Sequence, residues 1–180
     1  MGILPGGLDA HAGGSSFVIP VVGGIGVGRT LLSSFDAALK QCGVYNYNLV
    51  TLSSIIPPGS LVVALDRYES PPDEYGHRLY VVKAECRSAL RREGVAAGIG
   101  WHQWGDGRGV FVEHEASASS EGEARREVER SIRESLRDLC AFRDLPFDEH
   151  KIGSRVVTAE VEDEPVSVVV AAVFRAEGWF

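Results

Sequence analysis

The feature that most limits the possible folds is two helical hydrophobic patterns set among many short strand patterns. Apolar residues at three- and four-residue steps predict one helix that begins at Thr30 and ends at Gly43, and a longer helix after Ser120. The other apolar segments are short and bounded by turn residues, which is typical of strands. Because strands and helices do not alternate strictly, a doubly wound parallel sheet is not expected. The order predicts an α+β domain in which helices cover mainly antiparallel sheets.

Glycine, proline and charged turns separate the expected strands. Residues 105–109 carry a hairpin signature, and residues 162–165 predict a second hairpin near the end of the sequence. The expected strands cover residues 17–22, 48–52, 61–65, 79–85, 95–104, 110–116, 155–160 and 166–174. Residues 1–15 have little periodic signal and are expected to form a loose arm. A length of 180 residues predicts a single domain.

Composition and charge argue against several classes of function. The chain has 18 Lys and Arg against 25 Asp and Glu, a formal net charge of −7, so nucleic acid is not an expected partner. No apolar run reaches the ~18–20 residues of a membrane helix, and the first residues lack the regions of a signal peptide. Cys42, Cys86 and Cys140 have no metal-binding spacing. We therefore expect a cytoplasmic protein with no membrane or metal partner, whose charge suits a small cationic substrate.

A glycine-rich segment, Gly23–Thr30, has the spacing of a phosphate-binding loop. It follows an expected strand and precedes an expected helix, but Arg29 stands at the position of the essential lysine. Arginine is bulkier and planar, so it does not replace a compact ammonium there. The favoured interpretation is a tight strand-to-helix turn in which Thr30 caps the helix.

Residues 48–58, Asn-Leu-Val-Thr-Leu-Ser-Ser-Ile-Ile-Pro-Pro, are the most informative stretch. In one interpretation the serines end a strand and the prolines stiffen a loop. In another, a serine hydroxyl in a strained turn attacks the preceding carbonyl and converts the peptide bond into an ester. β-Elimination then cuts the chain and leaves a pyruvoyl group, a ketone that forms a Schiff base with an amine and acts as an electron sink. The residues alone leave both interpretations open.

The sequence resembles the pyruvoyl-dependent arginine decarboxylases over most of its length after Phe17. The resemblance rests on residues 33–39 (SSFDAAL), 46–49 (NYNL), 52–58 (LSSIIPP) and 111–115 (FVEHE). It implies a four-layer αββα sandwich that assembles as a homotrimer of αβ units or a hexamer, with sites at subunit interfaces. It also implies self-cleavage between Ser53 and Ser54 into a β chain (1–53) and an α chain (54–180), with Ser54 becoming the pyruvoyl cofactor.

The resemblance also implies roles for three further residues. Asn48 matches the position that assists cleavage, where an amide could polarise the scissile carbonyl. Glu113 matches the proton donor, which is needed because decarboxylation leaves a carbanion equivalent on the substrate. Asp36 matches a substrate-binding acid, and a carboxylate there could pair bidentately with a guanidinium.

Strand geometry limits what residues 113–115 can do. On a strand, Glu113 and Glu115 point to one face and His114 to the other. The two glutamates can therefore serve one pocket, whereas a three-ligand Glu-His-Glu metal site cannot form from adjacent strand residues. The alternative is that both glutamates are simply exposed on an edge strand, and for Asp36 the alternative is a solvated helix residue.

The sequence therefore predicts a self-processing decarboxylase that converts L-arginine to agmatine and CO2. One alternative keeps this chemistry but acts on another amino acid, for example an ornithine-like one. Arg29 bears on that choice, because relatives are expected to have an acidic residue there and a cation near the pocket would oppose a cationic substrate. Another alternative is an unprocessed, non-catalytic trimeric binding protein, and nucleotide binding by the glycine-rich segment is the third.

Overall fold

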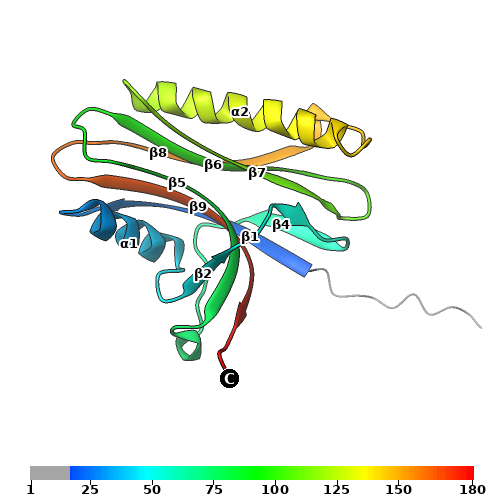
Figure 1. The fold of residues 1–180 in the computed structure, drawn as a ribbon, viewed down its shortest axis with the longest axis horizontal. Coiled ribbons are helices and arrows are strands. Elements are labelled where there is room, and N and C mark those ends of the chain that lie inside the picture. Colours follow the sequence, from blue (N-terminus) through cyan, green and yellow to red (C-terminus); the bar gives the residue numbers. More distant parts are fainter. Residues whose placement is uncertain (1–16) are drawn as a thin grey trace, which may run out of the picture.

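The computed structural model describes residues 17–180, which form two sheets packed face to face with one α-helix on the outer side of each (Figure 1). The helices are α1 (Leu31–Cys42) and α2 (Glu121–Ala141). The strands are β1 (Phe17–Val27), β2 (Asn48–Thr51), β3 (Ile55–Ile56), β4 (Ser60–Ala64), β5 (Arg78–Ser88), β6 (Gly94–Gln103), β7 (Gly109–Ala118), β8 (Ile152–Glu160) and β9 (Val166–Glu177). Short 3-10 turns occur at Pro72–Glu74 and Glu149–Lys151. The arm expected at residues 1–15 lies outside the described residues.

The five-stranded sheet has the order β2-β5-β9-β1-β4, and the four-stranded sheet has the order β3-β7-β6-β8. Only the β1–β4 and β2–β5 pairs are parallel among the described strands, and the other pairs are antiparallel. The predicted α+β class with mainly antiparallel sheets is therefore confirmed. No helix in the described part of the chain is long and apolar enough to span a membrane.

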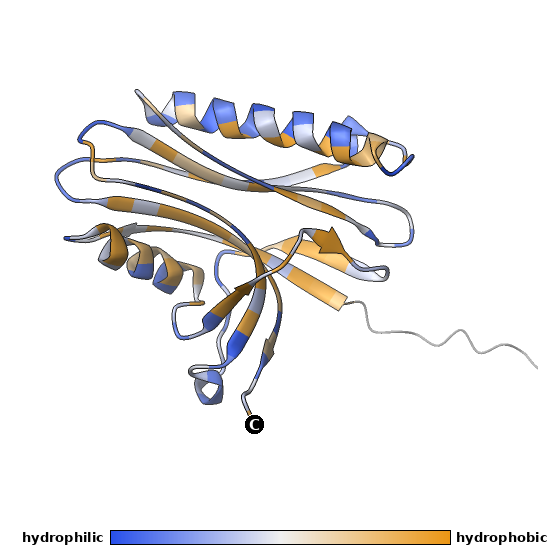
Figure 2. Cartoon of the chain, in the orientation of Figure 1, coloured by the Kyte–Doolittle hydropathy of each residue, from blue (hydrophilic) through white to orange (hydrophobic). Residues whose placement is uncertain are grey.

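Strand β9 shows how the hydrophobic pattern builds the layers. Val168, Val170 and Ala172 face the second sheet and pack in the core between the sheets. The alternate residues, Val169 and Ala171, face α1 and pack under it. Because both faces of β9 are covered, the strand is apolar at almost every position rather than at every second one. Figure 2 shows the same contrast, with apolar strands inside and a hydrophilic outer side on α2.

Helix α1 begins and ends as predicted, but the strand before it is longer than expected. Thr30 is the N-cap and accepts a hydrogen bond from the Ser33 amide, and Gly43 ends the helix with φ = 87°. The glycine-rich segment is not a turn, because Gly23–Val27 continues β1 and pairs with β9. A Cβ atom on Gly26 would lie 2.0 Å from the Ser34 carbonyl oxygen, so glycine is required for α1 to approach the sheet this closely.

This pairing also removes the basis for nucleotide binding. A phosphate-binding loop presents its backbone N–H groups to the ligand. Residues 23–27 instead pair with β9 as part of a strand, and α1 covers one face of this segment.

The hairpin predicted at residues 162–165 is wrong, whereas the one at residues 105–109 is confirmed. Strand β8 pairs with β6 in the four-stranded sheet, and β9 pairs with β5 and β1 in the other. The intervening segment therefore crosses from one sheet to the other. Stacked sheets lie only about 10 Å apart, so a short polar turn can join either two neighbouring strands or two facing sheets. The turn sequence alone cannot distinguish these cases.

A buried histidine at the end of β6 contacts the segment that follows α2 through a hydrogen bond and ring stacking. His102 is 2% exposed, and its Nε2 accepts a hydrogen bond from the Asp148 amide at 3.1 Å. The ring stacks on Phe147 with centroids 5.8 Å apart, and Trp104 donates its indole N–H to the Pro146 carbonyl at 2.9 Å. Burial lowers the pKa of His102. A protonated ring could not accept the Asp148 hydrogen bond, so the fold requires neutral His102.

We expect the free energy of unfolding to decrease on acidification in a way that depends on His102. The unfolded pKa is about 6.5 and the folded pKa is lower. The stability contributed by the neutral ring is therefore fully present above the unfolded pKa, and it is lost as the pH falls through the folded pKa. His102→Gln cannot be protonated, but it retains an amide oxygen that can accept the hydrogen bond.

Denaturant unfolding between about pH 5 and pH 8 measures this effect. Wild type should lose stability by up to about 1.4 kcal/mol for each pH unit between the two pKa values, and His102→Gln should lose less over the same interval. His150→Gln, at an exposed position, is the control and should behave as wild type. Equal slopes for wild type and His102→Gln would contradict the prediction.

Candidate active site

Ser54 adopts a left-handed backbone conformation, with φ = 45°. Such a conformation costs about 1–3 kcal/mol in a residue with a Cβ and persists only where the surroundings impose it. Its carbonyl accepts a hydrogen bond from the Phe111 amide at 2.8 Å, and the next two residues, Ile55 and Ile56, pair with β7. Before it, the Leu52 amide donates to the Val81 carbonyl at 2.8 Å. The Ser53–Ser54 bond is therefore held between the two sheets.

The side chain of Ser54 also has a specific partner. Its hydroxyl donates a hydrogen bond to Oε1 of Glu113 at 2.5 Å. Glu113 is half-buried on β7 and lies on the same face as Phe111, which packs in the core between the sheets. This hydrogen bond orients the serine oxygen and polarises its O–H bond, which favours its use as a nucleophile.

His114 points away from this site, because adjacent strand residues face opposite sides. Its Nε2 lies 2.9 Å from the hydroxyl of Ser135 on α2. Among residues 17–180, no group of three or more His, Cys, Asp or Glu side chains is placed to hold a metal ion.

Asn48 is the first residue of β2, whereas Ser54 lies just beyond the last residue of that strand. Its side-chain amide donates to the Gly76 carbonyl at 2.7 Å, and its backbone amide donates to the His77 carbonyl at 2.8 Å. In this structure the asparagine therefore holds the loop before β5 and makes no hydrogen bond with Ser53 or Ser54.

Asp36 is exposed on α1. The helix packs on β1, β9 and β5, on the face of the five-stranded sheet that points away from Glu113 (Figure 1). The five-stranded sheet therefore separates Asp36 from Ser54 within one chain. Arg29, which precedes α1, is exposed as well.

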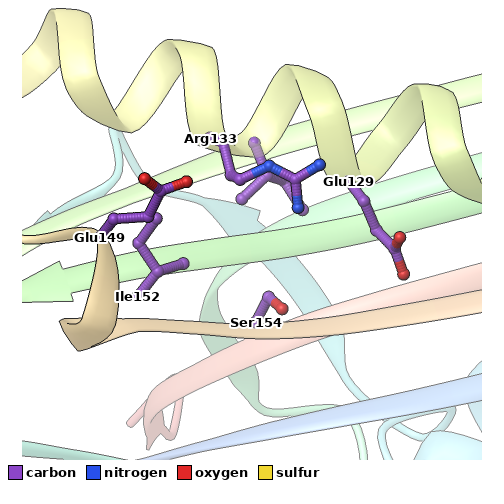
Figure 3. A pocket seen from close by; sticks show the side chains of 6 residues that line it. Glu129, Arg133, Glu149, Ile152 and Ser154 are labelled. Atoms are coloured by element: carbon purple, nitrogen blue, oxygen red, sulfur yellow. The ribbon is translucent and has the colours of Figure 1, made fainter.

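The cavities in the described structure differ from this serine site. A cavity of about 430 Å³ lies between α2 and β8, with Glu129, Arg133 and Glu149 at its walls (Figure 3). It lies on the outer side of the four-stranded sheet and at the opposite edge from β3. A second cavity, of about 340 Å³, borders Ile55–Pro58 but includes Arg108 and Arg143. Two arginines make that cavity a poor match for a cationic substrate.

The features that make Ser54 unusual cannot be read from the amino-acid sequence. The positive φ of Ser54 is not indicated by its residue type, because glycine, asparagine and aspartate, not serine, are the residues that commonly adopt the left-handed conformation. The backbone amide of Phe111, which holds the Ser54 carbonyl, is equally invisible. The one available signal was Ile55–Ile56 before two prolines, which is compatible with a very short edge strand.

The fold and the site define a class of enzyme. It is an α+β sandwich in which a strained serine, placed between the two sheets, is hydrogen-bonded to a carboxylate. Residues 18–178 match the family model described as pyruvoyl-dependent arginine decarboxylase (PvlArgDC). The chain belongs to this family, which confirms the resemblance drawn from the sequence.

Three relatives named pyruvoyl-dependent arginine decarboxylase illustrate the similarity. The protein of Halobacterium salinarum is 31% identical over 156 residues, which cover 86% of this chain and 92% of the relative. That of Methanocella arvoryzae is 32% identical over 157 residues, covering 84% and 90%. That of Methanococcus vannielii is 31% identical over 136 residues, covering 73% and 75%.

The family name implies a pyruvoyl prosthetic group, and the residues around Ser54 fit one. A serine, the residue type from which such a group can form, stands there; its hydroxyl donates a hydrogen bond to a carboxylate, and its backbone is in an unfavourable conformation.

Proposed function

We propose that this protein is a self-processing decarboxylase that converts L-arginine to agmatine and CO2 with a pyruvoyl group derived from Ser54. The observation that carries the proposal is the left-handed conformation of Ser54, which lies on a segment hydrogen-bonded to both sheets. The Ser54 hydroxyl also donates a hydrogen bond to Glu113. Membership of the family supports the cofactor and the reaction class.

Processing begins when Oγ of Ser54 attacks the carbonyl carbon of Ser53. The C–N bond breaks and an ester forms, with the proton moving to the freed amine. Loss of the Cα proton of residue 54 then expels the Ser53 carboxylate and leaves dehydroalanine at the new N-terminus. Its enamine tautomerises to an imine, and water replaces the nitrogen, which leaves as ammonia. The products are a β chain of residues 1–53 and an α chain of residues 54–180.

Glu113 remains beside position 54 after cleavage because β7 holds it there. When formed, the pyruvoyl ketone supplies an electron sink for the amine substrate through Schiff-base chemistry. Glu113 then has a separate task, which is to hold a proton next to the substrate Cα and deliver it after CO2 leaves. Asn48 is proposed to assist processing, which requires its side chain to leave the Gly76 carbonyl.

Asp36 can read the substrate guanidinium only from another copy of the chain, because the five-stranded sheet separates it from Ser54 of its own chain. We therefore propose a homotrimer of αβ units or a hexamer. Apolar side chains near the start of α1 support a covered surface there. Leu31 is 43% exposed, Leu32 is 72% exposed and Val27 on β1 is 55% exposed. Burying such side chains between subunits would be favourable.

A cytoplasmic location is part of the proposal, and it is supported by the free thiols of Cys42, Cys86 and Cys140. The same chemistry on another amino acid is the second candidate. It is favoured specifically by Arg29, an exposed cation just before the helix that carries Asp36. A non-catalytic binding protein would show no cleavage at all.

Replacement of the attacking serine tests self-cleavage. Ser54→Ala should give a single uncut and inactive chain of 19.4 kDa, because the nucleophilic oxygen is gone. Ser53→Ala should still be cut, since its side chain is not the nucleophile. Intact mass spectrometry is the measurement, and the two wild-type chains should sum to the uncut mass plus water minus ammonia. Cleavage of Ser54→Ala at the wild-type extent would refute the pyruvoyl proposal.

Glu113→Gln separates the two steps. The amide oxygen can still accept the Ser54 hydrogen bond, so we expect the variant to be cut. It cannot donate a proton as an acid, so the rate of CO2 release should fall about 10²–10⁴-fold. Release of ¹⁴CO2 from labelled arginine, normalised to the cleaved fraction on a denaturing gel, measures both effects. A cleaved variant with wild-type turnover would rule out the proton-donor role.

Asp36→Asn tests the substrate and the assembly together. We expect normal cleavage and an arginine KM about 10- to 100-fold higher, because a charged hydrogen-bond partner is lost. Arg29→Glu should lower the KM for arginine by removing an opposing cation. Comparison of arginine, lysine and ornithine in wild type identifies the preferred substrate, and sedimentation measures the oligomer. An unchanged KM in Asp36→Asn would exclude this residue from the substrate site.

A further inference from the structure

Glu115 is a second carboxylate on the face of β7 that carries Glu113. Residues two apart on a strand share a face, and β7 pairs regularly with β6 through this region, with Glu113 opposite Ile99 and Glu115 opposite Ala97. No bulge therefore interrupts the alternation. The side chains of Glu113 and Glu115 leave the sheet on the same side.

The exposure of this face increases along the strand. Phe111 is fully buried and its ring packs on Trp101 and Phe174, with centroids 6.3 and 6.2 Å away. Glu113 is half-buried and Glu115 is exposed. A molecule attached at position 54 next to Glu113 cannot extend toward Phe111, where the core is filled. Along this face of β7, its free end can extend only toward Glu115.

The edge of β7 is open on this side. Strand β3 pairs only with Val110 and Gly109, and the last backbone contact is the one between Phe111 and Ser54. From Val112 to Ala118 this edge of β7 has no strand partner among the described residues. A substrate can therefore lie along the edge without displacing a strand.

The spacing matches the length of the substrate. Two residues along a strand cover about 7 Å. The extended side chain of arginine places its guanidinium carbon about 6 Å from Cα, over five covalent bonds. With its Cα beside Glu113, arginine therefore reaches Glu115 with its guanidinium. A carboxylate can bind that group through two parallel hydrogen bonds.

The charge of Glu115 is available for such a contact. Its carboxylate has no hydrogen-bond or ion-pair partner among residues 17–180. Glu85, on the facing sheet, in contrast forms ion pairs with both Lys83 and Arg87. Glu115 lies close enough to β5 for its charge to act on the Cys86 thiol, whose pKa is raised mainly by burial and further by this charge.

We propose that Glu115 is a specificity-determining residue that binds the guanidinium end of the substrate from the same chain that supplies Ser54 and Glu113. The inference rests on the proposed decarboxylase function. It differs from the role of Asp36, which requires a second copy of the chain.

Paired assays with arginine and citrulline test this role. Citrulline has almost the same shape, but a neutral ureido group replaces the guanidinium. For Glu115→Gln we expect a KM for arginine about 10- to 100-fold higher, a kcat near wild type and an unchanged kcat/KM for citrulline. Glu115→Asp should recover part of the arginine KM. Glu160→Gln removes an exposed carboxylate at the far edge of the same sheet and is the matched control.

Two readouts keep the test independent of folding and of the proposed function. The cleaved fraction and the melting temperature of Glu115→Gln should equal those of wild type, since the side chain is exposed. An arginine-to-citrulline preference unchanged in this variant, with wild type active, would overturn the role of Glu115 alone. Wild type that is uncut, or that releases no CO2 from either compound, would instead refute the decarboxylase proposal.

Discussion

The Ser53–Ser54 peptide bond is where the chain crosses from one sheet to the other, and the rest of the candidate site depends on this crossing. Leu52 is hydrogen-bonded to Val81 in the five-stranded sheet, and Ile55 is already paired in the four-stranded sheet. Only two residues span the gap between them. The packed core between the sheets fixes both ends, with Ile56 only 1% exposed. The left-handed Ser54 is a consequence of this short connection, and its cost of about 1–3 kcal/mol is small beside the burial that imposes it.

The same arrangement explains how the domain could survive a cut at this bond. Strand β1 lies inside the five-stranded sheet between β9 and β4, and β2 pairs with β5 at its edge. Both precede the bond, whereas their partners follow it. Helix α1 is also seated on β9. A break between Ser53 and Ser54 would therefore leave the shorter piece held by strand pairing and by the core, and would change mainly the local backbone at position 54.

The parts of the fold that were predictable from the sequence depend on local chemistry. Thr30 and Gly43 bound α1 because a capping side chain and a left-handed glycine satisfy the helix ends. The extension of β1 through its glycines was not predictable, because it depends on how closely α1 approaches at Gly26. The crossing between β8 and β9 is not predictable from the sequence for a related reason. A turn sequence specifies a reversal of the chain but not which sheet the next strand joins.

The candidate site divides in the same way. Ser54 and Glu113 lie far apart in sequence; the resemblance to the family predicts both as site residues, and their side chains are hydrogen-bonded in the structure. The alternation along β7 correctly separated His114 from its neighbours, because that inference needs only strand geometry. The location of Asp36 behind the five-stranded sheet could not be predicted, since it depends on which face of the sheet α1 covers.

The net charge of −7 does not by itself show where negative charge is exposed, whereas the positions of the carboxylates in the structure do. Many carboxylates of the sheets and helices are engaged, as with Glu177, which pairs with Arg78 and Arg175. Glu127 is similarly paired with Arg130 on α2. Such pairs cancel one another at short range and contribute little to a field at the surface. Glu113 and Glu115, in contrast, form no ion pair among residues 17–180, and both lie on β7 beside its open edge. A positively charged molecule approaching this edge meets negative charge beside the residue that the fold holds under strain, so attraction and reactivity coincide at one edge of the four-stranded sheet.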